Sequence, residues 1–313
     1  MFCTSFFAFE FCFFAVVCFL LSKLRYFFSL NSFVFLFVIN CSIIVLFFAI
    51  GMNKKVAFVA LYTLYACALV AQNISRPLVV AHRGGAGEGL ENTLSCIERS
   101  IAAGVDAVEI DVRLTADGHI VVCHDATVNS TTNGCGCISE LTLQQVQALR
   151  VTDKMGVVTG ESIPTLGQVL SLVNGRCSLL IEVKQGGRGI EELLVREVLE
   201  ADAAGWVSVQ SFKDDVLHRL YEMNVPFSLE KLIVFKIPFL PLVFDGSLRY
   251  FSFDKYSFVS SFNFKKSFFP VSLAKKIRSL GKKVKVWTLS GPSDAPPLEV
   301  DAVITDFPSL WLP

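Results

Sequence analysis

Histidines and carboxylates suited to acid–base and metal chemistry gather in one stretch of this 313-residue sequence, from Val79 to Asp125. They stand at or near the ends of three apolar runs of strand length, as His82-Arg83, Glu109 with Asp111, and His124-Asp125. Histidine exchanges protons near neutral pH, and carboxylates bind hard cations. Arginine holds anionic groups through paired hydrogen bonds. The stretch therefore predicts proton transfer on an anionic substrate.

Three strands and a helix must bring these residues together. The apolar runs are Leu78–Ala81, Ala107–Ile110 and Ile120–Cys123, and a helical pattern from Thr93 to Ala103 separates the first two. A strand, a helix and a strand in this order predict a parallel βα unit. Ligands of such units gather at the carboxyl ends of the strands, so these histidines and carboxylates are expected to meet at one rim.

The spacing of the charged residues sharpens this prediction. Residues two apart on a strand share a face, as do Glu109 with Asp111 and Glu182 with Lys184. Three carboxylates on one rim repel one another, and one hard divalent cation, Mg²⁺ or Ca²⁺, relieves that repulsion. Such an ion also polarises a phosphoryl oxygen. Arg83 and Lys184 add the positive charge that an anionic substrate needs.

From residue 76 to residue 313 the sequence reads as one domain of alternating strands and helices. Further helical patterns cover Leu143–Leu149, Thr165–Val173, Glu191–Ala201, Asp214–Met223 and Leu273–Leu280. Further strand-like runs cover Ser178–Val183, Trp206–Gln210, Leu232–Ile237, Tyr250–Phe253, Lys283–Leu289 and Ala302–Thr305. The total of nine such runs is one more than a closed eight-stranded (β/α) barrel needs. One of the two runs between residues 224 and 269 is therefore expected outside the ring.

Phenylalanine is unevenly spread, because 15 of the 29 Phe lie in residues 1–51 and 11 more in residues 224–269. Both segments are expected either to face lipid or to escape the folding constraint on the rest of the chain. Residues 1–51 form a Phe-rich apolar extension, interpreted as two transmembrane or interfacial helices or as translated sequence upstream of the true start. The second interpretation is favoured, because residues 52–72 begin with Met52 and show the regions of a signal peptide. We expect the domain to be exported, periplasmic or secreted, or anchored to a membrane outside the cytoplasm.

Charge and cysteine use argue against other classes of protein. The formal net charge is zero, so the chain lacks the basic footprint of nucleic-acid binding. The five Cys after residue 72 are odd in number and include no CxxC pair, which favours free thiols over disulfides or a zinc site. His119 and His218 fall outside the motifs below and are expected on the surface.

A set of short motifs follows in order from Leu78 to Pro308. They are His82-Arg83-Gly84-Gly85, Glu91-Asn92-Thr93, Glu109-Ile110-Asp111, Val122-Cys123-His124-Asp125, Thr131-Thr132-Asn133-Gly134, Ile163-Pro164-Thr165-Leu166, Ile181-Glu182-Val183-Lys184, Ser211-Phe212, Val286-Trp287-Thr288 and Ile304-Thr305-Asp306-Phe307-Pro308. Single pieces of this set are weak signals. The ordered set resembles the glycerophosphodiester phosphodiesterases.

The resemblance implies a TIM barrel that hydrolyses small-molecule glycerophosphodiesters to sn-glycerol 3-phosphate and an alcohol. It assigns site residues by position: metal ligands Glu109, Asp111 and Glu182, an acid–base pair His82 and His124, and substrate contacts Arg83, Glu91, Lys184 and Trp287. In the family the attacking group is a neighbouring glycerol hydroxyl, and water then opens a cyclic phosphate. His82 would take the hydroxyl proton and His124 would protonate the leaving oxygen, although the sequence leaves these roles interchangeable.

Each of these residues also has a structural interpretation. A lone histidine is more often a hydrogen-bonded structural group than a catalytic one. Lys184 could pair with Glu182 without touching substrate, Glu91 could cap the helix that starts near Thr93, and Trp287 could belong to the core.

Two segments depart from the family pattern. Residues 290–300 are too short and too rich in Pro for a full helix, and residues 224–269 match poorly, so the C-terminal third is expected to be irregular and barrel closure stays open. Two alternative functions remain beside the hydrolase. One is a phospholipase-D-like lyase that acts on sphingomyelin or lysophospholipid and leaves a cyclic phosphate. The other is a catalytically defective, membrane-attached barrel.

Overall fold

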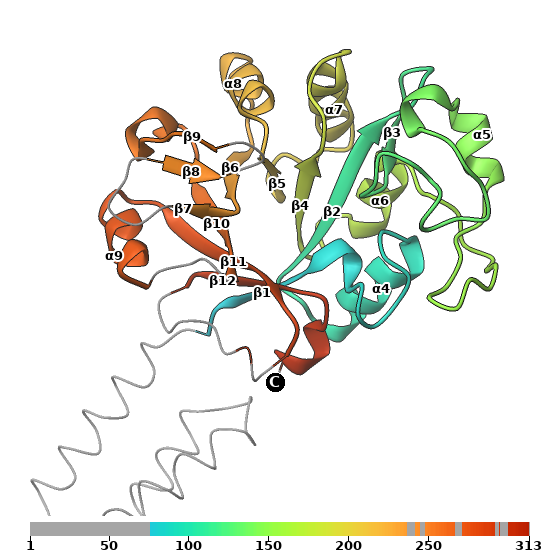
Figure 1. Ribbon diagram of the computed structural model, residues 1–313, viewed down its shortest axis with the longest axis horizontal. Coiled ribbons are helices and arrows are strands. Elements are labelled where there is room, and N and C mark those ends of the chain that lie inside the picture. The colour runs from blue at the N-terminus through green and yellow to red at the C-terminus, as the bar shows by residue number, and fades with distance from the viewer. Residues whose placement is uncertain are drawn as a thin grey trace, which may run out of the picture. The chain divides into compact units, whose positions relative to one another are not determined.

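The computed structural model describes residues 76–236, 242–244, 248–266, 271–291, 294 and 300–312. Residues Pro77–Leu312 form one compact unit, built on a closed barrel of eight parallel strands (Figure 1). In order around the ring these strands are β1 (Leu78–Ala81), β2 (Ala107–Leu114), β4 (Ser178–Val183), β5 (Val207–Ser211), β6 (Ser228–Ile233), β10 (Ser261–Lys265), β11 (Lys283–Leu289) and β12 (Ala302–Thr305). Parallel pairing of β12 with β1 closes the ring. The prediction of a TIM barrel is confirmed.

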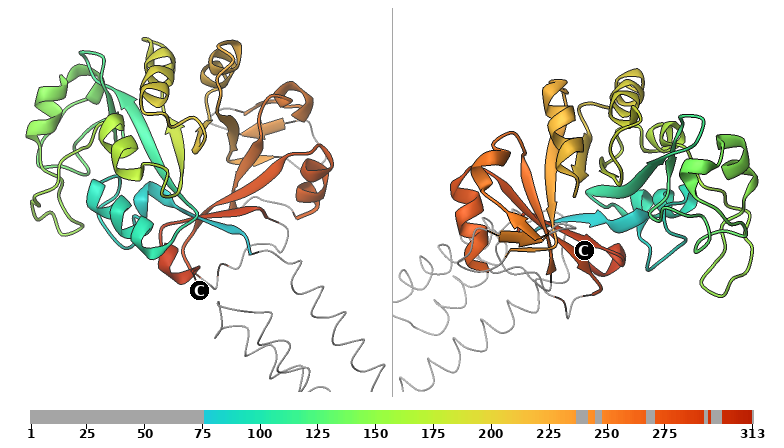
Figure 2. Two further views of the ribbon diagram at one scale, coloured as in Figure 1. Left: turned by 180° about the vertical axis from the view of Figure 1, so that it is seen from behind. Right: turned by 45° about the horizontal axis from the view of Figure 1, so that its top comes forward.

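Helices lie outside the strands, as Figures 1 and 2 show. They are α4 (Leu94–Ala103), α5 (Leu143–Ala148), α6 (Leu166–Val173), α7 (Ile190–Glu200), α8 (Asp214–Glu222) and α9 (Val271–Ser279), with short 3₁₀ turns η1 (His82–Gly84), η2 (Ile138–Glu140), η3 (Phe253–Tyr256) and η6 (Pro308–Leu310). Alternation along each strand separates two environments. On β2, for example, Val108 and Ile110 are fully buried in the apolar core, while Glu109 and Asp111 point into the barrel.

Several helices begin where the sequence supplies a capping side chain. Thr93 precedes α4 and accepts a hydrogen bond from the backbone of Cys96, and Gly104 in the left-handed region ends that helix. Thr142 and Thr165 open α5 and α6 with capping boxes. All six helical patterns expected from the sequence are present, with ends within two residues of those predicted.

The ring takes its strands differently from the prediction. The run Ile120–Cys123 forms β3 (Ile120–Val122), which pairs antiparallel with β2 and lies outside the barrel. The ring gains β10 instead, a strand that the sequence analysis did not single out. Its inward residues are Ser261 and Asn263, so the segment lacks a continuous apolar run.

The two Phe-rich candidate strands also turn out differently. The described part of the run Leu232–Ile237, which ends at residue 236, divides between the end of β6 and β7 (Phe235–Lys236). Tyr250–Phe253 falls at the end of β9 (Leu248–Tyr250) and the start of η3. With β8 (Leu242–Phe244), β7 and β9 make a small antiparallel sheet apart from the ring.

The expectation that residues 224–269 face lipid or escape folding constraint is wrong for the described part of that segment. Four aromatic residues there are buried together, and their rings lie 4.9–6.2 Å apart: Phe251, Phe253, Tyr256 and Phe262. They belong to the barrel's main apolar core. Three of the four lie in the connection between β6 and β10, where no α-helix appears among the described residues, and Phe262 lies on β10 itself.

The short connection after β11 does not prevent closure of the ring. Val286 pairs with Val303 across β11 and β12, and a register shift follows. No described helix in the chain is long and apolar enough to cross a membrane. The predictions for residues 1–51 and for the signal-like segment 52–72 lie outside the described residues and stay predictions.

Candidate active site

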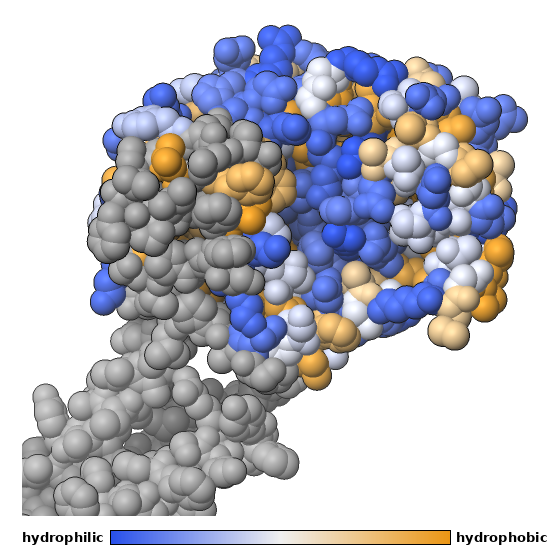
Figure 3. All heavy atoms as spheres, in the orientation of Figure 1, coloured by the Kyte–Doolittle hydropathy of each residue, from blue (hydrophilic) through white to orange (hydrophobic). Residues whose placement is uncertain are grey.

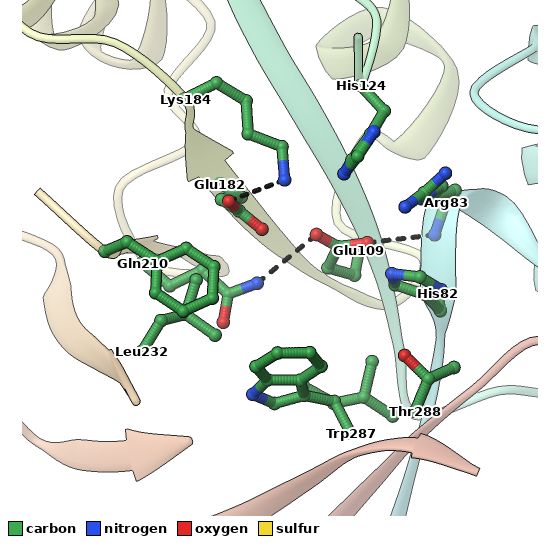
Figure 4. A pocket seen from close by; sticks show the side chains of 12 residues that line it. His82, Arg83, Glu109, His124, Glu182, Lys184, Gln210, Leu232, Trp287 and Thr288 are labelled. Carbon is green, nitrogen blue, oxygen red and sulfur yellow. Dashed lines mark hydrogen bonds and ion pairs between the residues drawn. The ribbon is translucent and has the colours of Figure 1, made fainter. Parts of the chain in front are cut away.

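One cavity at the carboxyl ends of the barrel strands gathers the residues that the sequence placed at a common rim (Figure 4). In Figure 3, hydrophilic side chains line a hollow in the middle of the described part. Twelve residues line the cavity: His82, Arg83, Glu109, His124, Glu182, Lys184, Gln210, Phe212, Leu232, Trp287, Thr288 and Ile304. Seven of the nine predicted site residues are among them. The other two, Glu91 and Asp111, contact Arg83 beside it.

Three buried carboxylates form the centre of the site. Glu109 and Asp111 come from β2 and Glu182 from β4, and one oxygen of each lies within 4.8 Å of the others. Asp111 and Glu182 are register partners across the two strands. The parity argument from the sequence therefore holds in three dimensions, because neighbouring parallel strands present both acids at the same height.

The donor set fits a hard divalent cation. All three candidate ligands are carboxylate oxygens, which suit Mg²⁺ or Ca²⁺ rather than a thiophilic metal. Oδ1 of Asp111 is buried and accepts no hydrogen bond within the described chain, although Lys184 Nζ lies 2.9 Å away. That oxygen therefore keeps a lone pair for a further ligand. The acidic residues of this site could hold one ion.

Each carboxylate of the centre is held by its own donor. The backbone N–H of Arg83 and the amide of Gln210 donate to the two oxygens of Glu109, at 2.9 and 3.2 Å. Nδ2 of Asn92 donates to Asp111 at 3.0 Å, and Lys184 donates to Glu182 at 2.6 Å. These donors fix the carboxylate orientations that a metal site requires.

Both histidines are anchored through Nδ1. Nδ1 of His82 lies 2.6 Å from Oδ1 of Asp306, and Nδ1 of His124 lies 2.8 Å from Oδ1 of Asp125. A carboxylate at Nδ1 favours the tautomer that carries its proton there, which leaves Nε2 for proton exchange. In Figure 4 both rings point to the cavity from either side of Glu109.

The surroundings push the pKa values of the two histidines in opposite directions. Burial works to lower the pKa of His82, but the hydrogen bond with Asp306 and the charge of Glu109 outweigh it and raise that pKa above its ordinary value. Burial, aided by the charge of Lys184, lowers the pKa of His124. Burial and the charge of Asp111 raise the pKa of Glu109 to about 8. In the absence of a cation, His82 is thus the more readily protonated histidine.

The His-Arg-Gly-Gly motif owes its sequence to backbone geometry. Arg83 has a φ of 50°, in the left-handed region, and this turn aims its N–H at Glu109. Gly84 and Gly85 follow with φ of 79° and 100°. A Cβ on Gly85 would lie 2.8 Å from the hydroxyl of Ser100, so only glycine fits this packing against α4.

The structure also bears on the structural interpretations of Glu91 and Trp287. Glu91 does not cap α4, because Thr93 does; its carboxylate instead binds the guanidinium of Arg83 at 3.1 Å. Trp287 is half-buried and lines the cavity, with its Nε1 donating to the carbonyl of Asn263 and its ring edge-on to Phe212. Trp287 also packs against the buried cluster that contains Val80 and Ile304, so it is both a core and a cavity residue.

The structure shows Lys184 both as an ion-pair partner and as a residue of the cavity wall. Its ammonium binds Glu182 and lies beside Asp111, yet it also lines the cavity (Figure 4). His119 and His218 are exposed, as predicted. The described cysteines are Cys96, Cys123, Cys135, Cys137 and Cys177, and all carry free thiols.

The comparison with family models matches residues 82–310 to the glycerophosphoryl diester phosphodiesterase family. The chain belongs to this family. The family consists of phosphoric diester hydrolases, so the resemblance seen in the sequence motifs is confirmed.

Relatives of known name and structure agree. A glycerophosphodiester phosphodiesterase of Caldanaerobacter subterraneus is 39% identical over 153 residues, which are 47% of this chain and 63% of that protein. A Bacillus subtilis protein that carries the same family name is 31% identical over 238 residues, 74% of this chain and 94% of that protein. The structure of an Oleispira antarctica phosphodiesterase, in complex with the product sn-glycerol-3-phosphate, matches with a TM-score of 0.64 and 25% identity over 75% of this chain and 94% of its own.

Four residues that hold the site of this phosphodiesterase-family chain were not predicted as functional: Asn92, Asp125, Gln210 and Asp306. Three of them stand within the quoted motifs, and each binds a side chain that the same motifs predict for the site. Gln210 ends the predicted strand Trp206–Gln210, and its inward parity was the available signal. Its partner, Glu109, is 101 positions away in sequence, so local patterns could not identify it.

Proposed function

We propose that this chain hydrolyses glycerophosphodiesters to sn-glycerol 3-phosphate and an alcohol, with one divalent cation, Mg²⁺ or Ca²⁺. The observation that carries the proposal is a site in which three converging carboxylates lie beside two carboxylate-anchored histidines, with Glu109, Glu182 and both histidines lining one cavity. The product sn-glycerol-3-phosphate bound to the Oleispira antarctica phosphodiesterase supports the substrate class.

Glu109, Asp111 and Glu182 would hold the cation. When bound, it polarises a phosphoryl oxygen and offsets the charge of the phosphate. Lys184 then contributes its ammonium, which already lies at 2.6 Å from one ligand and 2.9 Å from another, and Arg83 contributes its guanidinium from the opposite side. The ammonium of Lys184 and the guanidinium of Arg83 would both bind phosphate oxygens. Their ion pairs with carboxylates hold the two side chains at the cavity for this purpose.

The histidine pair moves the protons. One histidine takes the proton of a glycerol hydroxyl as its oxygen attacks phosphorus, and the other donates a proton to the oxygen of the departing alcohol. The products of this step are a cyclic phosphate and the free alcohol. Water then adds to the cyclic phosphate with the roles reversed, which breaks the ring and gives sn-glycerol 3-phosphate. Each histidine thus returns to its starting protonation state.

We assign the first proton acceptor as His82 and the leaving-group donor as His124. Asp306 lies at Nδ1 of His82 and stabilises the imidazolium that forms when Nε2 takes a proton. The charge of Glu109, which raises the pKa of His82, is offset when that carboxylate ligates a cation. Cation binding would thus weaken one of the effects that favour a proton on His82 in the cation-free site.

The remaining cavity walls would hold the organic part of the substrate. Trp287, Phe212 and Leu232 present apolar surface opposite the charged centre. An apolar wall facing a charged wall orients a molecule that has a phosphate at one end and a carbon skeleton at the other.

The test is hydrolysis of glycerophosphocholine and glycerophosphoethanolamine by the full-length chain. Mg²⁺ and Ca²⁺ are added in turn, with an EDTA control, and products are separated as sn-glycerol 3-phosphate or cyclic phosphate. We expect metal-dependent release of sn-glycerol 3-phosphate. A cyclic product from lysophospholipid or sphingomyelin, without sn-glycerol 3-phosphate, would support the lyase. No turnover by folded, metal-loaded protein would support the defective barrel.

A substrate with a nitrophenolate leaving group tests the assignment of the two histidines. Nitrophenolate leaves without protonation, so loss of the acid costs little with this substrate. We expect His124→Ala to regain activity on it and His82→Ala to stay inactive. The reverse pattern would exchange the two roles.

A further inference from the structure

A chain of buried polar groups leads from the cavity into the barrel interior, and the mechanism above uses only its first member, Glu109. It runs from Glu109 to Gln210, Asn263, Glu230 and Lys285, on strands β2, β5, β10, β6 and β11. The successive distances are 3.2, 2.8, 2.8 and 2.7 Å. Such a chain in a barrel core costs stability unless every member is satisfied, so it invites a reason beyond packing.

The first link depends on the orientation of an amide. Gln210 donates through Nε2 to Oε1 of Glu109, whose other oxygen takes the backbone N–H of Arg83. A glutamine rotated by half a turn would present its carbonyl oxygen to the same carboxylate and repel it. Whether Gln210 supports or opposes Glu109 therefore depends on what holds its other end.

Asn263 holds that end. Its Nδ2 group donates one hydrogen to Oε1 of Gln210 and the other to Oε2 of Glu230, both at 2.8 Å. Its Oδ1 accepts a hydrogen bond from the hydroxyl of Ser261 at 2.7 Å. With both hydrogens placed on acceptors, Asn263 leaves only the Nε2 hydrogens of Gln210 to face Glu109.

The direction of the whole chain is set at its far end by a charge pair. Nζ of Lys285 lies 2.7 Å from Glu230, and the two side chains are 13% and 4% exposed. An ionised carboxylate accepts hydrogen bonds and donates none, so Glu230 requires the N–H side of Asn263. Glu230 thereby fixes the orientation of the Asn263 amide, which fixes that of the Gln210 amide. Gln210 in turn directs its N–H group at Glu109, the carboxylate of the proposed metal site.

We propose that Asn263 is a positioning residue which, directed by the Glu230–Lys285 pair, fixes the amide of Gln210 so that it holds Glu109 in its cation-binding orientation. The proposal rests on the proposed metal-dependent function. It extends the site to β6 and β10, strands that supply no predicted ligand. The effect is on cation affinity and reaches Glu109 only through Gln210.

The test is a double-mutant cycle read by calorimetric titration of the full-length chain with Ca²⁺ alone and Mg²⁺ alone. The variants are Asn263→Leu, Gln210→Met and their combination. Supporting donors of metal ligands typically contribute 10- to 100-fold in affinity, so each single variant is expected to weaken Kd by roughly tenfold. Because Asn263 acts through Gln210, the double variant should bind no more weakly than Gln210→Met, within about twofold.

Ser211→Ala is the matched control. Ser211 follows Gln210 on β5 and is also buried. Its substitution removes a 2.7 Å hydrogen bond to the carbonyl of Val183 on the neighbouring strand β4. Its Kd for Ca²⁺ should stay within about twofold of wild type, whatever its melting temperature. A purely structural role of Asn263 would lower the melting temperature of Asn263→Leu and leave its Kd unchanged.

Two outcomes overturn the inference. One is an unchanged Kd in Asn263→Leu, and the other is a double variant in which the two losses add. If Asn263→Leu does not fold, the joint replacement Glu230→Gln with Lys285→Met carries the test, since it removes both charges together. It should weaken Kd in wild type and not in the Gln210→Met background. A wild-type chain that binds neither ion would instead count against the metal-dependent function itself.

Discussion

The two halves of the barrel divide the work unequally. The strands β1, β2 and β4, with the segments that follow them, carry eight of the nine predicted site residues, and each crossover between these ring strands contains an α-helix. The half from β6 to β12 supplies Trp287 alone, and two of its crossovers contain no α-helix among the described residues. Yet both halves share one closed ladder of backbone hydrogen bonds. Closure of the barrel therefore requires only strand pairing, whereas the active site requires particular side chains at particular strand ends.

The second half nevertheless reaches into the first. Asp306 follows β12 and anchors His82, and Asn263 on β10 holds Gln210. The motifs that predict the metal ligands do not show these hydrogen-bonded partners. The barrel therefore holds three kinds of residue: those that react, those that position a reacting group, and those that only stabilise the fold.

The largest effect is expected from loss of a histidine in the first half. His124→Ala removes a group placed for proton transfer, which typically contributes 10²- to 10⁴-fold, so kcat should fall by that factor. The melting temperature should stay near that of wild type, because the side chain is 32% exposed. The matched control is His119→Ala, whose ring is exposed and pairs only with Asp117 among the described residues. Equal losses in the two variants would contradict the site.

Cation affinity should depend steeply on pH. The pKa of Glu109 is raised to about 8, chiefly by burial and then by the charge of Asp111, so below that pH a proton must leave before the carboxylate can ligate. Kd for Ca²⁺ should therefore tighten by up to about tenfold per pH unit as the pH rises toward 8, and level off above it. Calorimetry in two buffers of different ionisation enthalpy measures the released proton. An affinity that is flat from pH 6 to 8 would argue against this coupling.

A smaller effect is expected from Asp306→Asn, which tests support across the halves. Loss of the carboxylate lowers the pKa of His82, so the pH limb of kcat/KM that belongs to His82 should move to lower pH. The loss in kcat should be smaller than in His124→Ala, because the imidazole itself remains. Asp254→Asn, at an exposed site away from the cavity, should leave the pH profile in place. An unshifted limb in Asp306→Asn would show that Asp306 does not act through His82.

Stability gives the same pair a second readout. Folding raises the pKa of His82 above 6.5, so the His82–Asp306 pair stabilises the fold fully below that value and loses this contribution as the pH rises through the raised pKa. The difference in melting temperature between wild type and Asp306→Asn should therefore be larger at pH 6 than at pH 9. A difference that grows with pH would reverse the sign and refute the assigned shift.

The sequence predicted the first half of the site because its signals are local. The spacing of Glu109 and Asp111 alone shows that they share a face of the strand. The six helices are predicted by the helical periodicity of their apolar residues and by capping residues such as Thr93 and Thr165. The carboxyl-end rule for parallel strands then brought distant residues to one rim. These steps need only neighbours in sequence and one general property of the fold.

What the sequence could not show depends on partners far along the chain. Ile120–Cys123 has the composition of a ring strand, and only its antiparallel pairing with β2 places it outside. Ser261–Lys265 hides a ring strand because its inward positions carry Ser and Asn for the buried chain to Glu230. The anchoring of His82 by Asp306 joins residues 224 positions apart. Pairing of this kind is decided by tertiary packing, which local patterns do not record.

The smallest effect on catalysis is expected from the aromatic cluster of the second half. Phe253 is 7% exposed and packs edge-on against Phe251 and Phe262, each at 4.9 Å. Phe253→Ala should lower the free energy of unfolding by about 3–5 kcal/mol, measured by urea denaturation. Below the melting temperature kcat/KM should stay near wild type, because Phe253 is not one of the residues that line the cavity. The control Tyr250→Ala removes an aromatic side chain of a residue that is 62% exposed and should change neither quantity. A folded Phe253→Ala protein with greatly reduced kcat/KM would show that this core shapes the site, and the division between folding and chemistry would then fail.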